Sequence, residues 1–215
     1  MNFKTYREVE GYRALSMARI CQEVSKDAEV CIAVCPPLME LSNVASSVNI
    51  PVLAQHTDPV KPGSHTGWTT PEGAKAAGAS GTLLNHSEHK MMLTDISTSV
   101  VLCRAATLQT IVCADSAETA GACAFLKPDF IAVEPPELIG GEISVTNAKP
   151  EVVENAVRAV HRVDDSIPVL CGAGVKTGGD VKRAIELGAR GVLLASGVVK
   201  SEDVKKTLQD LINFL

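Results

Sequence analysis

Three short segments of the chain carry side chains that could together move a proton beside a carbonyl group. They are Asn2-Phe3-Lys4 at the start, Asn85-His86-Ser87-Glu88 in the middle, and Ala132-Val133-Glu134-Pro135-Pro136 further on. Lys4, His86 and Glu134 each stand at, or within one or two residues of, the end of an apolar, strand-like run. Because the carboxyl ends of parallel barrel strands open on one face, we expect a cation, an imidazole and a carboxylate in one pocket.

The elements that would position these side chains are short apolar runs that alternate with helical stretches. Continuous apolarity over a few residues is typical of a strand buried on both faces. The predicted strands span 30–34, 52–55, 81–84, 110–113, 130–133, 169–171 and 191–194. The predicted helices span 8–25, 37–47, 71–77, 91–107, 116–125, 150–161, 179–187 and 203–213. This alternation indicates parallel βαβ units.

An internal repeat favours a closed barrel over an open sheet. Residues 78–84 (GASGTLL) match residues 188–194 (GARGVLL), and the two segments stand four units apart in the order of predicted strands. The strand expected before Asn2 is missing or truncated at the first residue of the chain. We therefore predict an α/β fold, a (β/α)8 barrel that forms a single domain over residues 1–215, with its first strand missing or truncated.

Composition excludes several classes of function. The 215 residues are 46% hydrophobic, which suffices for one substantial core, and the net charge of −5 argues against a nucleic-acid or membrane surface. No apolar run reaches the roughly 18 residues of a membrane span. The seven cysteines are an odd number, and Cys31, Cys103, Cys113 and Cys171 lie in apolar runs. This usage indicates reduced core thiols in a cytoplasmic protein.

With these segments, the chain resembles the triosephosphate isomerase family in its shorter, archaeal form. The resemblance covers nearly the whole chain. It rests on Asn2-Phe3-Lys4, Thr66-Gly67, Asn85-His86-Ser87-Glu88, residues 134–140 (EPPELIG), residues 171–175 (CGAGV) and residues 194–197 (LASG), in this order. The resemblance implies interconversion of dihydroxyacetone phosphate and glyceraldehyde 3-phosphate, with no metal and no organic cofactor.

The resemblance also implies a role for each catalytic candidate. Glu134 would be the base that lifts a carbon-bound proton, and its apolar neighbours would raise its basicity by partial desolvation. His86 would be the neutral electrophile, which we expect to open a helix whose peptide N–H groups disfavour the imidazolium. Lys4 would hold the phosphate and stabilise the enediolate. Asn2 would orient the substrate or Lys4, and Glu88 would support Lys4.

The phosphate site is expected to consist of backbone rather than side chains. Family contact positions fall on Ile139, Gly140, Gly174, Ala195 and Ser196, where glycine lets the main chain approach an anion closely. The loops after the last two barrel strands usually grip phosphate in this fold.

Residues 135–141 resemble the lid that closes over the substrate and excludes water. Gly141-Glu142 stands where the family more often has Thr-Gly, which changes the hydrogen bonding expected in the closed lid.

The long loop 56–67 resembles the family segment that enters a neighbouring subunit, where Thr66 would touch the partner's site. We therefore expect a homo-oligomer, a dimer or a tetramer, and we expect His89 to be a helix-surface residue without a catalytic role. Two alternatives remain. One is another phosphate-binding (β/α)8 enzyme, such as a phosphoribosyl-compound isomerase or a thiamin-phosphate-type synthase. The other is an inactive, incomplete barrel that only binds anions or a partner chain.

Overall fold

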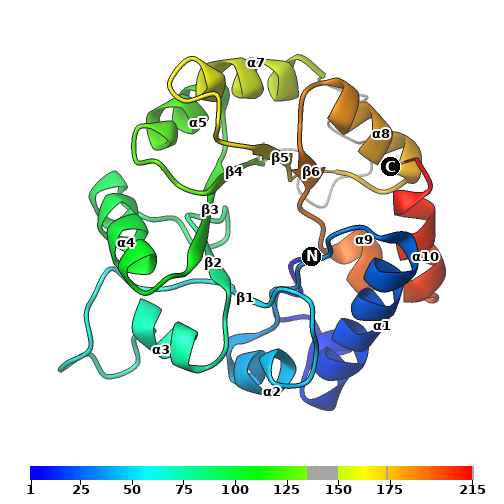
Figure 1. The fold of residues 1–215 in the computed structure, drawn as a ribbon, viewed down its shortest axis with the longest axis horizontal. Helices are drawn as coiled ribbons and strands as arrows, with labels where there is room; N and C mark the ends of the chain where they lie inside the picture. The colour runs from blue at the N-terminus through cyan, green and yellow to red at the C-terminus, as the bar shows by residue number, and fades with distance from the viewer. Residues whose placement is uncertain (135–149, 173, 215) are drawn as a thin grey trace.

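A parallel sheet of six strands lies at the centre of the computed structural model, which describes residues 1–134, 150–172 and 174–214. The strands are β1 (Leu53–Ala54), β2 (Gly81–Leu84), β3 (Gln109–Ala114), β4 (Phe130–Val133), β5 (Val169–Cys171) and β6 (Gly191–Val192). Each pairs in parallel with the next in chain order. Figure 1 shows that the sheet curls into a ring with helices on its outside. The fold is of the predicted (β/α)8-barrel type, with the first two strand positions, at Asn2 and Val34, present as isolated parallel bridges.

The first residues of the chain close the ring. The Asn2 N–H donates to the Leu194 carbonyl beyond β6 at 2.7 Å, and on the other side the Phe3 N–H donates to the Cys35 carbonyl at 3.0 Å. Asn2 also forms a parallel bridge with Cys35. The chain start accordingly lies between β6 and β1 in Figure 1. The residues at the start of the described chain thus bond both neighbouring strands, so that neither adjacent edge is left unpaired at Asn2.

The strand predicted over 30–34 is wrong in its extent. Pairing is limited to its last residue, where Val34 forms an isolated parallel bridge with Val52. The reason is the end of the preceding helix: the Val30 N–H donates to the Ser25 carbonyl at 3.2 Å, and the Ser25 hydroxyl donates to the Val30 carbonyl at 2.6 Å. The backbone N–H and carbonyl of Val30 are therefore both bonded to the last turns of that helix and are not available to pair with a strand.

The helices cover the outer face of the sheet (Figure 1). Those described are η1 (Arg7–Val9), α1 (Tyr12–Ala28), η2 (Leu38–Glu40), α2 (Leu41–Ala45), α3 (Pro71–Ala76), α4 (Leu93–Ala105), α5 (Ala117–Ala124), α7 (Pro150–His161), α8 (Gly178–Glu186), α9 (Ser196–Val199) and α10 (Val204–Ile212). Side chains of Thr70, Ser116 and Thr177 cap α3, α5 and α8 by accepting a backbone N–H. The prediction of one helix over 37–47 is wrong, because a 3-10 turn precedes α2.

One part of the hydrophobic core fills the inside of the ring of strands. Inside the ring, buried side chains from successive strands meet: Cys35, Leu53, Leu83, Ile111, Cys113, Ala132 and Leu193. All seven cysteines are free, and six are buried, as expected for reduced thiols. Cys31 is exposed, which corrects its prediction as a core residue. In the described ranges, no helix combines the length and apolarity needed to cross a membrane.

Candidate active site

Glu134 is held at the carboxyl end of β4. Its N–H donates to the Ala114 carbonyl of β3 at 2.8 Å, so the backbone is fixed by the sheet. The residue is only 4% exposed. Burial raises the pKa of the Glu134 carboxyl to about 7, although a hydrogen bond with the Cys113 thiol and then the Lys4 cation oppose this shift. A carboxylate with such a pKa is a stronger base than an exposed one and is still substantially ionised at neutral pH.

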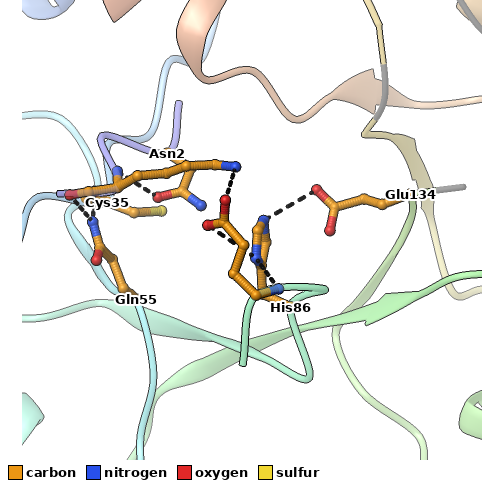
Figure 2. Close-up of polar contacts among 7 residues, drawn as sticks. Asn2, Cys35, Gln55, His86 and Glu134 are labelled. Atoms are coloured by element: carbon orange, nitrogen blue, oxygen red, sulfur yellow. Dashed lines mark hydrogen bonds and ion pairs between the residues drawn. The ribbon is translucent and has the colours of Figure 1, made fainter. Parts of the chain in front are cut away.

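His86 faces this carboxylate from the end of β2. Its Nε2 lies 3.6 Å from Oε1 of Glu134, and Figure 2 shows the two side chains pointing toward one another. The Glu88 N–H lies 3.2 Å from Nδ1 of His86 and donates to it. This bond assigns the ring proton of the neutral imidazole to Nε2, the atom that faces the pocket.

Burial, and then the Lys4 cation, lower the pKa of His86, while Glu88 partly opposes them. The imidazole is therefore neutral at physiological pH. The prediction that His86 opens a helix is wrong, because α4 begins only at Leu93. Burial and the Lys4 cation replace the expected helix terminus as the cause of neutrality.

Lys4 reaches the same pocket in a constrained backbone conformation, with φ of 50°. Its Nζ lies 2.7 Å from Oε1 of Glu88, an ion pair in which the lysine side chain is 11% exposed. The Lys4 N–H donates to Oδ1 of Asn2 at 2.9 Å. Its carbonyl accepts from Nε2 of Gln55 at 2.9 Å, and the same amide donates to the Cys35 carbonyl at 3.0 Å, as Figure 2 shows. Asn2 therefore contacts the backbone of Lys4, and Gln55, which has no predicted role, contacts it as well.

A pocket of about 380 Å³ joins these groups. Its lining includes Asn2, Lys4, His86, Glu88 and Glu134, together with the predicted phosphate positions Gly174, Ala195 and Ser196. Tyr6, Gly172 and Lys176 also line it and were not predicted. Thr66 is exposed in its loop and is not part of the lining. Ile139, Gly140, the lid 135–141 and Gly141-Glu142 lie outside the described residues.

His89 does not lie on a helix surface as predicted. It stands in the loop before α4, where its ring stacks on that of His56 with centroids 4.0 Å apart. Neither ring belongs to the pocket lining. Elsewhere among the described residues, no cluster of three His, Cys, Asp or Glu side chains has a geometry that could hold a metal ion.

Gly172, directly after β5, packs against the base. A Cβ added there would lie 2.4 Å from Cγ of Glu134, far inside normal contact. The absence of a side chain at this position is what leaves room for the carboxylate to face His86.

Gly172→Ala should therefore displace Glu134. We expect kcat to fall roughly 100-fold, because a shift of about 1 Å in a reacting group has effects of that order. Steady-state kinetics would measure the loss. Gly121→Ala on α5 is the matched control, because its Cβ would meet Ala159 at an ordinary 3.4 Å. Equal activity of the two variants would mean that Gly172 does not fix the position of Glu134.

The fold and this pocket first define a class, the (β/α)8-barrel enzymes that work at the carboxyl ends of their strands. The triosephosphate isomerase family model matches residues 1–214. A triosephosphate isomerase of Methanothermus fervidus is 54% identical over 212 residues, which cover 99% of this chain and 96% of that protein. The one of Methanocaldococcus jannaschii is 50% identical over 215 residues, covering 100% of this chain and 98% of the relative. That of Archaeoglobus fulgidus is 47% identical over 215 residues, covering 100% and 96%.

The chain belongs to the triosephosphate isomerase family. It is accordingly an enzyme of the isomerase class, and the comparisons favour neither of the alternatives left by the sequence.

Proposed function

We propose that this enzyme interconverts dihydroxyacetone phosphate and D-glyceraldehyde 3-phosphate through an enediolate, with Glu134 as base, His86 as electrophile and Lys4 as electrostatic partner. The observation that carries the proposal is the pairing of a buried carboxylate with Nε2 of a neutral imidazole at 3.6 Å. Lys4, the third member of the set, lines the same pocket. The reaction needs no metal or organic cofactor.

The chemistry follows from the positions of these groups. Glu134 removes the proton beside the substrate carbonyl, and the C–H electron pair becomes the double bond of the enediolate. The Nε2–H of His86 donates to the oxygen on which negative charge develops. Lys4 adds a positive charge at short range. The hydroxyl proton of the enediolate passes through Nε2 of His86 to the former carbonyl oxygen. Glu134, now protonated, gives its proton to the carbon that bears that oxygen, so that a carbonyl forms at the other carbon and the enzyme is left unchanged.

The phosphate is expected to lie against Gly174, Ala195 and Ser196, where the backbone borders the pocket. The first peptide N–H groups of a helix lack intrahelical partners and can donate to an anion. Ile139 and Gly140 would complete this grip when the lid over 135–141 closes, and Gly141-Glu142 would alter the hydrogen bonds of the closed form.

The activity is tested by turnover of D-glyceraldehyde 3-phosphate in a coupled assay. We expect isomerase turnover, because Asn2, which lines the pocket, is held between both neighbouring strands. We also expect 2-phosphoglycolate, which mimics the enediolate, to bind far more tightly than inorganic phosphate. Absence of turnover combined with equal affinity for the two anions would instead support a barrel that only binds anions.

The pH dependence should report the base. Because the pKa of Glu134 is raised to about 7, kcat/KM should fall about tenfold per pH unit below that value, as the carboxylate becomes protonated. The substrate phosphate has its own ionisation near pH 6, so the midpoint must lie clearly above 6. A profile measured from pH 5 to 9 that shows only the limb near 6 would contradict the assignment of a buried base.

The proposed assembly is a homo-oligomer, a dimer or a tetramer, formed through loop 56–67. The neck just beyond the start of this loop is preorganised: the Asp58 N–H donates to the Thr69 carbonyl at 2.8 Å, and the Thr69 N–H donates to Oδ2 of Asp58 at 2.6 Å. The segment between β1 and α3 projects from the body of the subunit in Figure 1. Within this segment Trp68 is 52% exposed, and it offers an apolar side chain that a partner subunit would cover.

Thr66→Arg should disrupt this assembly, because a bulky charge in this loop cannot be desolvated in a partner's pocket. We expect the wild type to sediment with at least twice the mass of one chain and the variant to shift toward a single chain. Ser64→Arg places the same charge nearer the middle of the loop, and sedimentation velocity would compare the masses of the two variants. A wild type that stays monomeric at micromolar concentration would refute the assembly.

The cellular setting follows from the proposed reaction. Interconversion of the two triose phosphates belongs to glycolysis and gluconeogenesis, and the seven free thiols suit the reducing cytoplasm. The partner molecules are therefore a small phosphorylated substrate and further copies of this chain, without nucleic acid or membrane.

A further inference from the structure

The segment 85–91 links β2 to the approach of α4 and carries both His86 and Glu88. We propose that Asn85 is a positioning residue, which holds this segment against the end of β3 and thereby aims the imidazole of His86 at Glu134. This inference rests on the proposed role of His86 and adds a residue to which no role has been assigned.

The backbone of Asn85 makes the turn that leads into the pocket. Its φ is 57°, in the left-handed region that is costly for most side chains, and asparagine tolerates this region better than most. The turn takes the chain out of the sheet directly after Leu84, the last residue of β2. The Asn85 N–H accordingly donates to Sδ of Met91 at 3.3 Å.

The side chain of Asn85 then replaces the lost pairing. Its Nδ2 donates to the carbonyl of Cys113 in β3 at 2.9 Å, one residue beyond Val112, which pairs with the end of β2. Its Oδ1 accepts the Met91 N–H at 3.0 Å. The amide thus uses both ends, and the residue is only 5% exposed. One buried side chain ties the two ends of segment 85–91 to each other and to the sheet.

The end of β3 is also the anchor of the base. Ala114, next to Cys113, accepts the N–H of Glu134 at 2.8 Å. The positions of the electrophile and the base are therefore both fixed by β3. The segment that carries His86 is bonded to the Cys113 carbonyl through Asn85, and Glu134 is bonded directly to the adjacent Ala114 carbonyl. If the hydrogen bond from Asn85 is lost, the His86 segment is no longer fixed to β3, while Glu134 stays bonded to it.

Three substitutions separate the functions of this side chain. Asn85→Gly keeps the left-handed turn and removes both hydrogen bonds of the side-chain amide. Asn85→Asp keeps the acceptor for Met91 but turns a carboxylate oxygen toward the Cys113 carbonyl and adds negative charge beside His86. Ser116→Ala is the control, because it removes a hydrogen bond that caps α5, near the end of β3, without contacting the pocket.

We expect Asn85→Gly to lower kcat roughly 10- to 100-fold, because misplacement of a reacting group by about 1 Å has effects of this size. Inhibition by inorganic phosphate should change less than threefold, because the backbone at Gly174 and Ser196 is untouched. The control should retain wild-type kcat. A kcat for Asn85→Gly within twofold of the wild type, or a loss of kcat matched by an equal loss of phosphate affinity, would overturn the inference.

Asn85→Asp supplies a readout that a general loss of stability would not produce. The charged groups that already surround His86 are Lys4, Glu88, Lys90 and Glu134, and they stay in place. The added negative charge should raise the pKa of both the His86 imidazole and the Glu134 carboxyl, so the acid limb of kcat/KM should move to higher pH than in Asn85→Gly. An unshifted limb would contradict contact between residue 85 and the His86 environment.

The role of His86 itself is tested separately. His86→Gln should lower kcat by orders of magnitude. If it does so while Asn85→Gly is fully active, the positioning inference fails and the proposed function stands. If His86→Gln is itself fully active, the proposed electrophile is wrong, and the inference that depends on it falls with it.

Discussion

Glu134→Gln is expected to lower kcat/KM roughly 10²- to 10⁴-fold, the usual contribution of a general base. The amide keeps the shape of the side chain beside Gly172 but cannot accept a proton from carbon. Coupled-assay kinetics would measure the loss, and Glu118→Gln on the exposed face of α5 is the control, because it also removes one carboxylate. Wild-type kinetics in Glu134→Gln would contradict the assignment of Glu134 as the base.

The same substitution should stabilise the folded protein at high pH. The folded-state pKa of Glu134 is raised from 4.5 to about 7, so its ionised form is disfavoured by folding. This penalty is absent below the unfolded value, grows as pH rises between the two values, and is complete above 7. Glutamine removes it, so Glu134→Gln should gain about 1–3 kcal/mol at pH 8 and nearly nothing at pH 4.5. Denaturant unfolding at both pH values tests the sign.

Lys4→Met should have a comparably large effect on turnover. Methionine retains the apolar stem but removes the cation that faces the developing enediolate and the phosphate. We expect kcat/KM to fall roughly 10³-fold, with weaker binding of 2-phosphoglycolate as well. Lys205→Met, on the exposed ion pair with Glu23, is the control and should leave the kinetics unchanged.

The Lys4→Met change also leaves Glu88 without its partner, and this second effect has to be separated from the first. The double variant that combines Lys4→Met with Glu88→Gln removes the orphaned carboxylate. If the lost cation is the cause, the double variant stays as slow as the single one. Recovery of wild-type turnover in the double variant would show that Lys4 acts only by neutralising Glu88.

Several elements could be predicted from local patterns because they are buried on both sides. The runs 81–84, 130–133 and 169–171 coincide with β2, β4 and β5, since continuous apolarity is what such strands require. The run 30–34 has the same composition and forms no strand, because its first residue is bonded into the end of α1. The pattern reports burial, and it does not report which hydrogen bonds the backbone makes.

The short helix α9 (Ser196–Val199) was missed for a related reason. With four residues it is too short to show a helical period, and its residues follow β6 as a continuation of the same apolar run. Its position matters for function, because its first residues border the pocket at the expected phosphate position.

In the candidate site, too, residue types and local spacing could be interpreted from the sequence, whereas contacts between residues far apart in the chain could not. The types of Lys4, His86 and Glu134, and their places after strand-like runs, indicated proton transfer. Gln55 and Asn85 could not be given roles, because the contacts that matter join residues 51 and 28 positions apart. An asparagine or glutamine at a strand end followed by a catalytic segment is the only local signal, and it is a weak one.

The neutrality of His86 was expected for a partly wrong reason. The sequence suggested a helix terminus, and the structure has a turn in which one peptide N–H, that of Glu88, contacts the ring. Spacing cannot separate these cases, because both place polar N–H groups soon after a buried strand. The roles of Ile139, Gly140 and Thr66 stay predictions that rest on the family.

The central claim is that a side chain carries the proton between two carbons, and isomerisation in D2O tests it most directly. Proton NMR would follow conversion of D-glyceraldehyde 3-phosphate to dihydroxyacetone phosphate by the wild-type enzyme. Because the protonated Glu134 can exchange with solvent during the lifetime of the enediolate, we expect deuterium at the newly protonated carbon in a substantial part of the product. Absence of product would contradict the isomerase activity. Product that retains only the original hydrogen, formed at the same rate by Glu134→Gln, would indicate a hydride shift and contradict proton transfer through Glu134.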